Sequence, residues 1–246
     1  MQLRSSVHRI RQPRSPSANL RYSEVKICEG ETVFAAILYD LDGTIADTDP
    51  VHFIAWQDVL REFGVEIDET IYKQRMSGRT NPPIIAEFLP QLTSAEGEAL
   101  GDRKEARFRE LAEHLQPIAG FRELIDWGKQ HSLKQALVTN APRENARFML
   151  KLLKLDQVFD RVILADDLGI GKPDPAPYNH ALMEFGLNPN QAIAFEDSPS
   201  GVRSAVAAGI STIGITSTQT PETLQGLGVR FAIADFTAPE LWALLQ

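Results

Sequence analysis

The chain has 246 residues, of which 43% are hydrophobic, and a formal net charge of -8 at pH 7. Its length allows one globular domain or a domain with an insertion, and no run of about 18 apolar residues predicts a membrane span. The acidic balance disfavours nucleic acid and anionic membranes as partners, because such binding surfaces need excess Lys and Arg. A small ligand is the expected partner, and a monomer is favoured.

The N-terminal segment differs from the rest of the chain. Its first 27 residues hold five arginines, one lysine and five serines against one acidic residue, Glu24. We predict that residues 1–30 form a disordered arm. An organellar transit peptide has a similar composition, so an organelle such as the chloroplast is the alternative to a cytoplasmic location. The single cysteine, Cys28, cannot form an internal disulfide, which fits a reducing compartment.

Five apolar runs of strand length follow, separated by amphipathic segments of helix length. The runs are "VFAAILYD" (33–40), "LKQALVTN" (133–140), "RVILA" (161–165), "QAIAFED" (191–197) and "STIGIT" (211–216). Apolar strands separated by helices predict a parallel sheet that is covered on both faces. The expected fold class is α/β, with a Rossmann-like doubly wound core formed by residues 31–49 and 118–246.

Residues 50–117 interrupt this alternation and contain no convincing strand. Helical patterns occur in "HFIAWQDVLREFG" (52–64) and "AEGEALGDRKEARFRELAEHL" (95–115). We predict an inserted helical cap. Because it leaves and rejoins the sheet beside the first strand end, the cap should lie over the carboxyl ends of the strands and exclude water there.

Each of three strand runs ends in polar residues. Ligands of doubly wound sheets bind beyond the carboxyl ends of the strands, so these side chains should meet at one site. Carboxylates gathered there can bind Mg²⁺. Two acids can also share covalent catalysis, in which one attacks an electrophile and the other exchanges protons. The residues at these ends are Asp40, Asp42, Thr139, Asn140, Glu196 and Asp197.

Four motifs in order resemble those of the haloacid dehalogenase superfamily. They are "DLDGT" (40–44), "TN" (139–140), "KPDP" (172–175) and "FEDS" (195–198), and the resemblance covers residues 33–246. A helical insertion after the first motif resembles the subgroup that contains phosphoglycolate phosphatases, sugar and glycerol phosphate phosphatases and β-phosphoglucomutase. The resemblance implies a Mg²⁺-dependent phosphatase that hydrolyses a small sugar or polyol phosphate through an aspartyl-phosphate.

The resemblance also implies roles for individual residues. Asp40 would be the nucleophile, Asp42 the acid and base, and Lys172 would neutralise charge between nucleophile and phosphate. Mg²⁺ would be held by Asp40, the backbone carbonyl of Asp42 and Asp197, with Glu196 in a supporting position.

Further residues are expected to contact the substrate. Thr139 and the backbone of Asn140 would bind phosphoryl oxygens. In the cap, His52 is a candidate for contacting a substrate hydroxyl or setting the protonation of Asp42. Arg79 and Asn81 lie in a cap loop and are candidates for substrate recognition.

Two other functions remain open. A β-phosphoglucomutase-like mutase is the nearer alternative, because "DTDPVHFIAW" (47–56) resembles the mutase segment. The mutase has cationic residues where this chain has Ser77 and Asn81, which favours hydrolysis. A non-catalytic metabolite-binding module is the second alternative, but a binder needs neither a nucleophile nor a second acid. Dehalogenation is disfavoured, since dehalogenating members lack the acid at Asp42.

Overall fold

The computed structural model describes residues 34–246. The predicted arm, residues 1–30, lies outside the described residues. No helix of residues 34–246 combines the length and apolar character that crossing a membrane requires.

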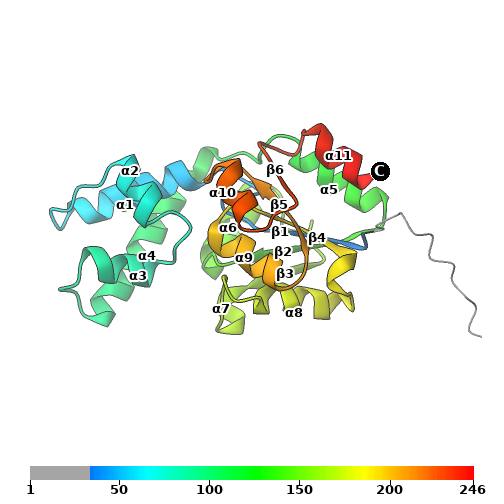
Figure 1. Cartoon of the computed structure of the whole chain (residues 1–246). Coiled ribbons are helices and arrows are strands. Elements are labelled where there is room, and N and C mark those ends of the chain that lie inside the picture. The colour runs from blue at the N-terminus through cyan, green and yellow to red at the C-terminus, as the bar shows by residue number, and fades with distance from the viewer. Residues whose placement is uncertain (1–33) are drawn as a thin grey trace, which may run out of the picture. The chain divides into compact units, whose positions relative to one another are not determined.

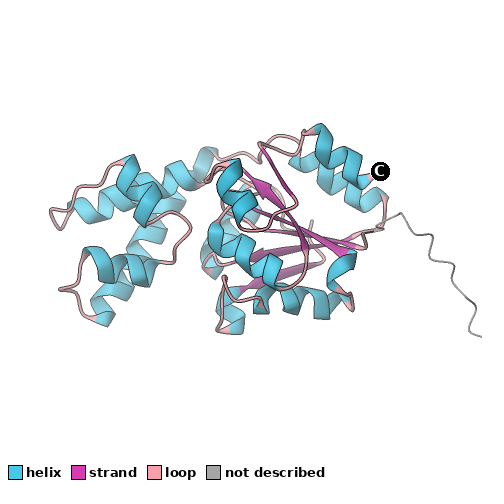
Figure 2. Cartoon of the chain, in the orientation of Figure 1, coloured by secondary structure: helices cyan, strands magenta, loops and turns pink. Residues whose placement is uncertain are grey.

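The centre of the fold is a parallel sheet of six strands in the order β3-β2-β1-β4-β5-β6 (Figures 1 and 2). The strands are β1 Ala36–Tyr39, β2 Lys134–Thr139, β3 Arg161–Leu164, β4 Ala192–Glu196, β5 Ser211–Ile215 and β6 Phe231–Ile233. The order reverses direction between β1 and β4, and such a switch point opens a crevice at the carboxyl ends of the strands. The predicted fold class is confirmed.

One strand departs from the sequence prediction. The five apolar runs correspond to β1 to β5, but β6 was not expected. It has three residues at the sheet edge and pairs only with β5 in the described residues. A run this short carries too little periodicity to separate it from a loop, so only the pairing identifies it.

Helices cover both faces of the sheet because alternate strand residues point to opposite sides. Ile37 and Tyr39 of β1 join the cluster packed by α5, α6 and α11, whereas Ala36 and Leu38 join the cluster packed by α8 and α9. The helices around the sheet are α5 Phe121–Gln130, α6 Arg143–Leu152, α7 Ala165–Leu168, α8 Ala176–Phe185, α9 Pro199–Ala207, α10 Pro221–Gly226 and α11 Pro239–Leu245, with a short 3₁₀ turn at Pro189–Gln191.

Between β1 and α5 the chain forms helices and no strand, as the sequence predicted. They are α1 Asp49–Arg61, α2 Glu69–Arg75, α3 Asn81–Phe88 and α4 Ser94–Leu111, followed by a 3₁₀ turn at Ala112–His114. They form one group in Figure 1, with a hydrophobic cluster of their own that includes Trp56 and Leu100. This group is the inserted helical cap. We propose that this cap spans residues 50–117.

N-cap residues mark the starts of two cap helices, α4 and α1. A capping box starts α4, because Thr93 accepts from the backbone N–H of Glu96 while the Glu96 side chain accepts from that of Thr93. Thr48 is the N-cap of α1, and Asp47, the residue before it, is exposed.

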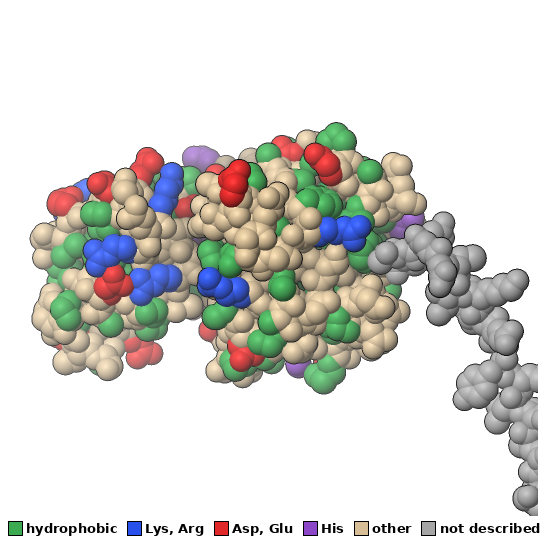
Figure 3. Space-filling model, in the orientation of Figure 1, with side chains coloured by type: hydrophobic (Ala, Val, Ile, Leu, Met, Phe, Trp, Pro, Cys, Tyr) green, Lys and Arg blue, Asp and Glu red, His purple; other side chains and the backbone are tan. Residues whose placement is uncertain are grey.

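On the face seen in Figure 3, basic side chains are interspersed with acidic ones over the cap, and the described residues form no continuous basic stripe there.

Candidate active site

The strand ends bring three carboxylates together. Asp40 follows β1, Glu196 is the last residue of β4, and Asp197 comes next. One oxygen from each of the three lies within 4.8 Å of the others, and all three side chains are buried. The adjacency of β1 and β4 therefore creates the acidic site that the sequence predicted.

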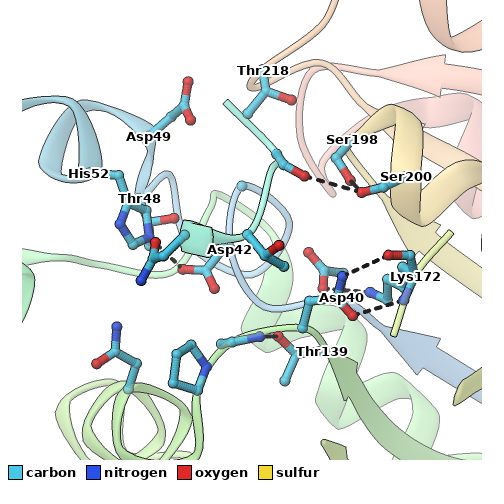
Figure 4. Close-up of a pocket in the computed structure, with 18 of the residues that line it drawn as sticks. Asp40, Asp42, Thr48, Asp49, His52, Thr139, Lys172, Ser198, Ser200 and Thr218 are labelled. Carbon is cyan, nitrogen blue, oxygen red and sulfur yellow. Dashed lines mark hydrogen bonds and ion pairs between the residues drawn. The ribbon is translucent and has the colours of Figure 1, made fainter. Parts of the chain in front are cut away.

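Lys172 reaches this cluster from the loop before α8 and is buried (Figure 4). Its Nζ donates to Asp40 Oδ1 at 2.6 Å and to the carbonyl oxygen of Val138 at 2.7 Å, and it lies 2.6 Å from Glu196 Oε1. Burial lowers the pKa of Lys172, but the charges of Asp40 and Glu196 outweigh it and raise the pKa above its ordinary value. Lys172 therefore stays cationic.

Glu196 is held from several sides. Tyr178 donates a hydrogen bond of 2.5 Å to Oε1, the oxygen that also faces Lys172. The other oxygen, Oε2, is the only buried side-chain polar atom of the described residues without a hydrogen-bond partner. It lies against Gly201 of α9, where a Cβ would stand 1.8 Å away. Glu196, a member of the cluster with Asp40 and Asp197, thus keeps one buried carboxylate oxygen without a hydrogen bond.

Asp197 is positioned by hydroxyl groups that the sequence reading did not single out. Thr218 donates to Oδ2 at 2.7 Å and Thr44 donates to Oδ1 at 3.3 Å. The turn after Asp42 passes close to this carboxylate, because a Cβ on Gly43 would lie 2.2 Å from Oδ2. Gly43 also has a φ of +76°, a conformation that favours glycine.

The carboxylate cluster fits a hard divalent cation such as Mg²⁺, which prefers oxygen ligands. Asp40, Glu196 and Asp197 supply three carboxylates, whereas Lys172 is the one Lys or Arg among the described residues that line the cavity. The unpartnered oxygen of Glu196 also calls for a positive group. Asp40 and Asp197 would hold the ion, with Glu196 beside it.

Without a cation, the cluster disfavours its own ionisation. Burial raises the pKa of Asp40 to about 7, with Lys172 acting in the opposite direction. Burial, together with the charges of Asp40 and Glu196, raises the pKa of Asp197 well above its ordinary value. A bound cation would favour the ionised forms of both.

The second acid, Asp42, lies on the cap side of the cavity with 31% of its side chain exposed. His52 of α1 faces it, with Nε2 3.5 Å from Asp42 Oδ1. Partial burial raises the pKa of Asp42, but the hydrogen bonds of His52 and Thr48 and the charge of Lys104 outweigh it and lower the pKa. His52 therefore lies next to Asp42, the carboxylate whose protonation the sequence analysis expected it to influence.

Lys104 of α4 fixes the tautomer of His52, and the sequence reading missed it. Its Nζ lies 2.8 Å from His52 Nδ1. An ammonium group can only donate, so Nδ1 accepts and the imidazole proton resides on Nε2, which faces Asp42. Phe108 stacks on the imidazole with ring centroids 4.0 Å apart. The ring is held by both contacts.

Glu105 extends this arrangement from the cap to the helices around the sheet. Its Oε1 accepts from Lys104 at 2.9 Å and from Asn81 at 2.7 Å, and its Oε2 accepts from Asn145 of α6 at 2.5 Å. Glu105 and Asn145 are both buried and line the cavity. Asn81 is therefore near the predicted site, where it orients Glu105.

Thr139 and Asn140 follow β2 and line the cavity, as predicted. The Thr139 hydroxyl accepts from the Ala141 N–H at 2.9 Å, which leaves its own proton free for a ligand. The Asn140 side chain has a task that was not predicted. It accepts from the Lys172 backbone N–H at 2.9 Å and donates to its carbonyl oxygen at 3.1 Å, which fixes the Lys172 loop.

Arg79 is the one predicted residue that the structure does not bring to the site. Its guanidinium forms an ion pair of 2.6 Å with Glu87 of α3 and also donates to the Arg75 carbonyl oxygen. It is not among the residues that line the cavity. The structure thus pairs Arg79 with a cap carboxylate outside the cavity, and its contact with substrate stays a prediction.

All the other predicted residues except Glu196 line one cavity of about 450 Å³ between the cap and the strand ends. Figure 4 shows Asp40, Thr139 and Lys172 on one side, and Thr48 and His52 on the other. The cap loop between α2 and α3 contacts α9 at the cavity wall, where Ser200 donates to the Gly78 carbonyl oxygen at 3.3 Å. This arrangement places the protein among α/β enzymes that have an inserted cap and a carboxylate site at the switch point of the sheet.

Comparison with known proteins identifies the family. The family model for haloacid dehalogenase-like hydrolases matches residues 37–215, and the chain belongs to this family. The "Phosphorylated carbohydrates phosphatase" of Thermotoga maritima is 34% identical over 182 residues, which cover 72% of this chain and 83% of that protein. The "Validoxylamine A 7'-phosphate phosphatase" of Streptomyces hygroscopicus is 31% identical, with coverages of 78% and 90%.

Other relatives show the breadth of the family. The "Beta-phosphoglucomutase" of Bacillus subtilis is 26% identical over 189 residues, which cover 73% of this chain and 82% of that protein. A crystal structure of a family IA haloacid dehalogenase hydrolase from Entamoeba histolytica is 27% identical and superimposes with a TM-score of 0.79, covering 86% of this chain and 98% of that one. The family predicted from the four motifs is confirmed.

Proposed function

We propose that this chain is a Mg²⁺-dependent phosphatase that hydrolyses a small sugar or polyol phosphate monoester through an aspartyl-phosphate. The observation that carries this proposal is the pairing of Asp40 with a second acid, Asp42, in one cavity with Lys172. The named activities of the phosphatase relatives support a phosphorylated carbohydrate as the substrate type.

In the first step, Asp40 is the nucleophile. The hydrogen bonds among the described residues occupy Oδ1 with Lys172 and leave Oδ2 free to attack phosphorus. As the new bond forms, the bond from phosphorus to the ester oxygen breaks, and Asp42 in its protonated form gives its proton to that oxygen. The lowered pKa of Asp42 makes this form scarcer but a stronger acid. Bound Mg²⁺ would offset negative charge on the carboxylates and the phosphoryl group.

In the second step, Asp42 is the base. Now ionised, it takes a proton from water, the water oxygen attacks phosphorus, and the bond to Asp40 breaks to release inorganic phosphate. His52 donates its Nε2 proton toward Asp42 and lowers its pKa, which favours the ionised form that this step needs. The Thr139 hydroxyl and the Asn140 backbone N–H would bind phosphoryl oxygens, and the cap would exclude bulk water.

The proposal is tested by phosphate release from p-nitrophenyl phosphate and from a panel of sugar and polyol phosphates, with MgCl₂ and with EDTA. We expect release that EDTA abolishes and that Asp40→Asn lowers by at least about 10³-fold, because the amide cannot act as the nucleophile. A chain that binds these esters without releasing phosphate would instead be a binding module. Undiminished turnover by Asp40→Asn would overturn the aspartyl-phosphate.

A mutase is the second candidate, since a β-phosphoglucomutase is among the relatives. Two contacts disfavour it here. Ser77 donates to Asp49 at 3.0 Å and Asn81 donates to Glu105 at 2.7 Å, so the positions at which a mutase carries cations serve to orient carboxylates. The test supplies β-glucose 1-phosphate with a catalytic amount of the 1,6-bisphosphate. We expect inorganic phosphate to exceed glucose 6-phosphate, and the reverse ratio would favour the mutase.

We also propose a reducing compartment such as the cytoplasm, which the single cysteine supports. The organellar alternative depends on residues 1–30, outside the described part of the chain.

A further inference from the structure

Asp49 is an acidic residue of the cavity wall with no part in the proposed chemistry. It lies in the first turn of α1, on the cap side of the cavity (Figure 4). Tyr72 donates to its Oδ1 at 2.8 Å and Ser77 donates to the same oxygen at 3.0 Å. Because Tyr72 is buried within the hydrophobic cluster of the cap, this carboxylate has a fixed orientation. The hydrogen bonds within residues 34–246 leave Oδ2 without a donor.

The pair formed by Asp49 and Tyr72 is electrostatically part of the site. Burial raises the pKa of the Tyr72 phenol, and so do the charges of Asp49, Asp42 and Asp197. The phenol therefore stays protonated and donates to Asp49, within range of the carboxylates at the strand ends.

No lysine, arginine or histidine of residues 34–246 forms an ion pair with Asp49. The lysine of the cavity wall, Lys172, is paired with Asp40 and Glu196, and both ring nitrogens of His52 are engaged. The cap side of the cavity therefore offers a bound ester a hydrogen-bond acceptor and a negative charge.

We propose that Asp49 determines specificity by selecting phosphate esters whose leaving group is uncharged and carries hydroxyls. A carboxylate can only accept hydrogen bonds, so Oδ2 can bind a hydroxyl of a polyol or sugar. A carboxylate or second phosphate on the leaving group has no proton to donate and is repelled by the same oxygen. This inference rests on the proposed phosphatase function and adds the residue that rejects anionic substrates.

Matched substrates test the inference, because they differ in one terminal group. Glucitol 6-phosphate and 6-phosphogluconate have the same length and end in a hydroxymethyl group and a carboxylate. Glycerol 3-phosphate and 3-phosphoglycerate form a shorter pair of the same kind. The readout is the ratio of kcat/KM within each pair, which cancels any general loss of activity. We expect the wild-type chain to prefer the neutral member, by at least about 10-fold in the pair that reaches Asp49.

The variant Asp49→Asn keeps the size of the side chain, removes its charge and adds an N–H donor. We expect it to lower the ratio of neutral to anionic substrate by about 10-fold or more, the scale of one hydrogen bond to a charged group. Tyr72→Phe and Ser77→Ala remove the groups that orient Asp49 and should lower the ratio less. These two variants also keep the test informative should Asp49→Asn fail to fold.

Asp47→Asn is the matched control, because Asp47 is exposed two residues earlier and does not line the cavity. It makes the same change of net charge, so an unchanged ratio there and a lowered ratio in Asp49→Asn would assign the effect to contact. An unchanged ratio in Asp49→Asn, or a wild-type preference for the anionic members, would overturn the inference. If the wild-type chain released phosphate from no ester, the proposed function itself would fail, a different and distinguishable outcome.

Discussion

Two glycines leave the space that the carboxylates of Asp197 and Glu196 occupy. Gly43 adopts a positive φ and leaves room for Asp197, while Gly201 leaves room for Glu196. These close approaches explain why small residues follow the acidic motifs. At Gly201 the backbone is helical, so space is the constraint there rather than conformation.

Gly201→Ala separates helix propensity from packing. Propensity alone predicts that alanine would stabilise α9 by up to about 1 kcal/mol. The structure predicts the opposite, because the new Cβ would lie 1.8 Å from Glu196 Oε2. We expect a loss of about 1 to 3 kcal/mol in the free energy of unfolding and reduced Mg²⁺-dependent turnover. Gly226→Ala, with nothing within 4 Å of its Cβ, is the control and should be near neutral in urea denaturation.

The pKa of Asp40 predicts how pH and metal affect stability. Its folded value of about 7 exceeds the ordinary 3.8, so the folded chain binds this proton more tightly than the unfolded chain does. The contribution to stability is therefore complete below about pH 4 and is lost as pH rises toward 7. Mg²⁺ competes with the proton, so its stabilising effect should grow over the same range.

Thermal melting with and without saturating MgCl₂ measures this effect. We expect a larger increase in Tm at about pH 8 than at about pH 5, and a weaker dependence on pH in Asp40→Asn. Equal increases at both pH values in the wild-type chain would contradict a site whose carboxylates must ionise to bind the ion.

At the scale of elements, α4 connects the cap to the site. Lys104 orients His52, and Glu105 bonds to Asn145 of α6, so one turn of this helix touches both sides of the cavity. Burial raises the pKa of Glu105, but the charge of Lys104 and the hydrogen bonds from Asn81 and Lys104 outweigh it and lower the pKa. The ionised forms of Lys104 and Glu105 therefore stabilise each other in the buried pair.

A double-mutant cycle tests this dependence. Lys104→Met should lower the free energy of unfolding by about 3 kcal/mol, because it leaves Glu105 buried without a cation. Adding Glu105→Gln should restore part of that loss, with a coupling energy of at least about 1 kcal/mol. The exposed pair of Lys73 and Glu69 on α2, 3.7 Å apart, is the control and should couple by less than about 0.5 kcal/mol. Equal coupling in both pairs would argue against a special role for the buried one.

At the scale of the whole molecule, the cap shares the main hydrophobic core. Phe108 near the end of α4 packs in the same cluster as Tyr39 and Phe195 of the sheet, whereas Leu100, earlier in that helix, packs within the cap cluster. The base of the cap is thus continuous with the core, although the cap has its own interior.

Hydrogen exchange followed by mass spectrometry distinguishes these two regions. Phe108→Ala should lower the free energy of unfolding by about 3 to 5 kcal/mol and reduce protection in both α4 and the strands. Leu100→Ala should reduce protection mainly in α1 to α4. The same protection pattern in both variants would show that cap and sheet unfold as one unit.

The motifs at strand ends were predictable because they are local. Asp40, Thr139 and Asp197 directly follow or end apolar runs, and parallel topology then brings those ends to one edge. Asp49, Lys104 and Glu105 were not predictable in this way. On a helical pattern, charged residues indicate a solvated face, and only the packing of α4 against α1 and α6 buries Lys104 and Glu105. The role of Arg79 stays a prediction; in the structure Glu87 pairs with its guanidinium outside the cavity, a contact that no local pattern indicates.

The sequence by itself determined the α/β class, the inserted helical cap, the family and the acids at the strand ends, because hydrophobic periodicity and contiguous motifs are properties of neighbouring residues. The tertiary structure alone decided which polar groups face each other: Lys104 toward His52, Glu105 toward Asn145, and Asp49 on the cavity wall without an ion pair among residues 34–246. Those pairings join segments up to 52 residues apart in the chain. They depend on how the cap packs against the sheet, which no local pattern encodes.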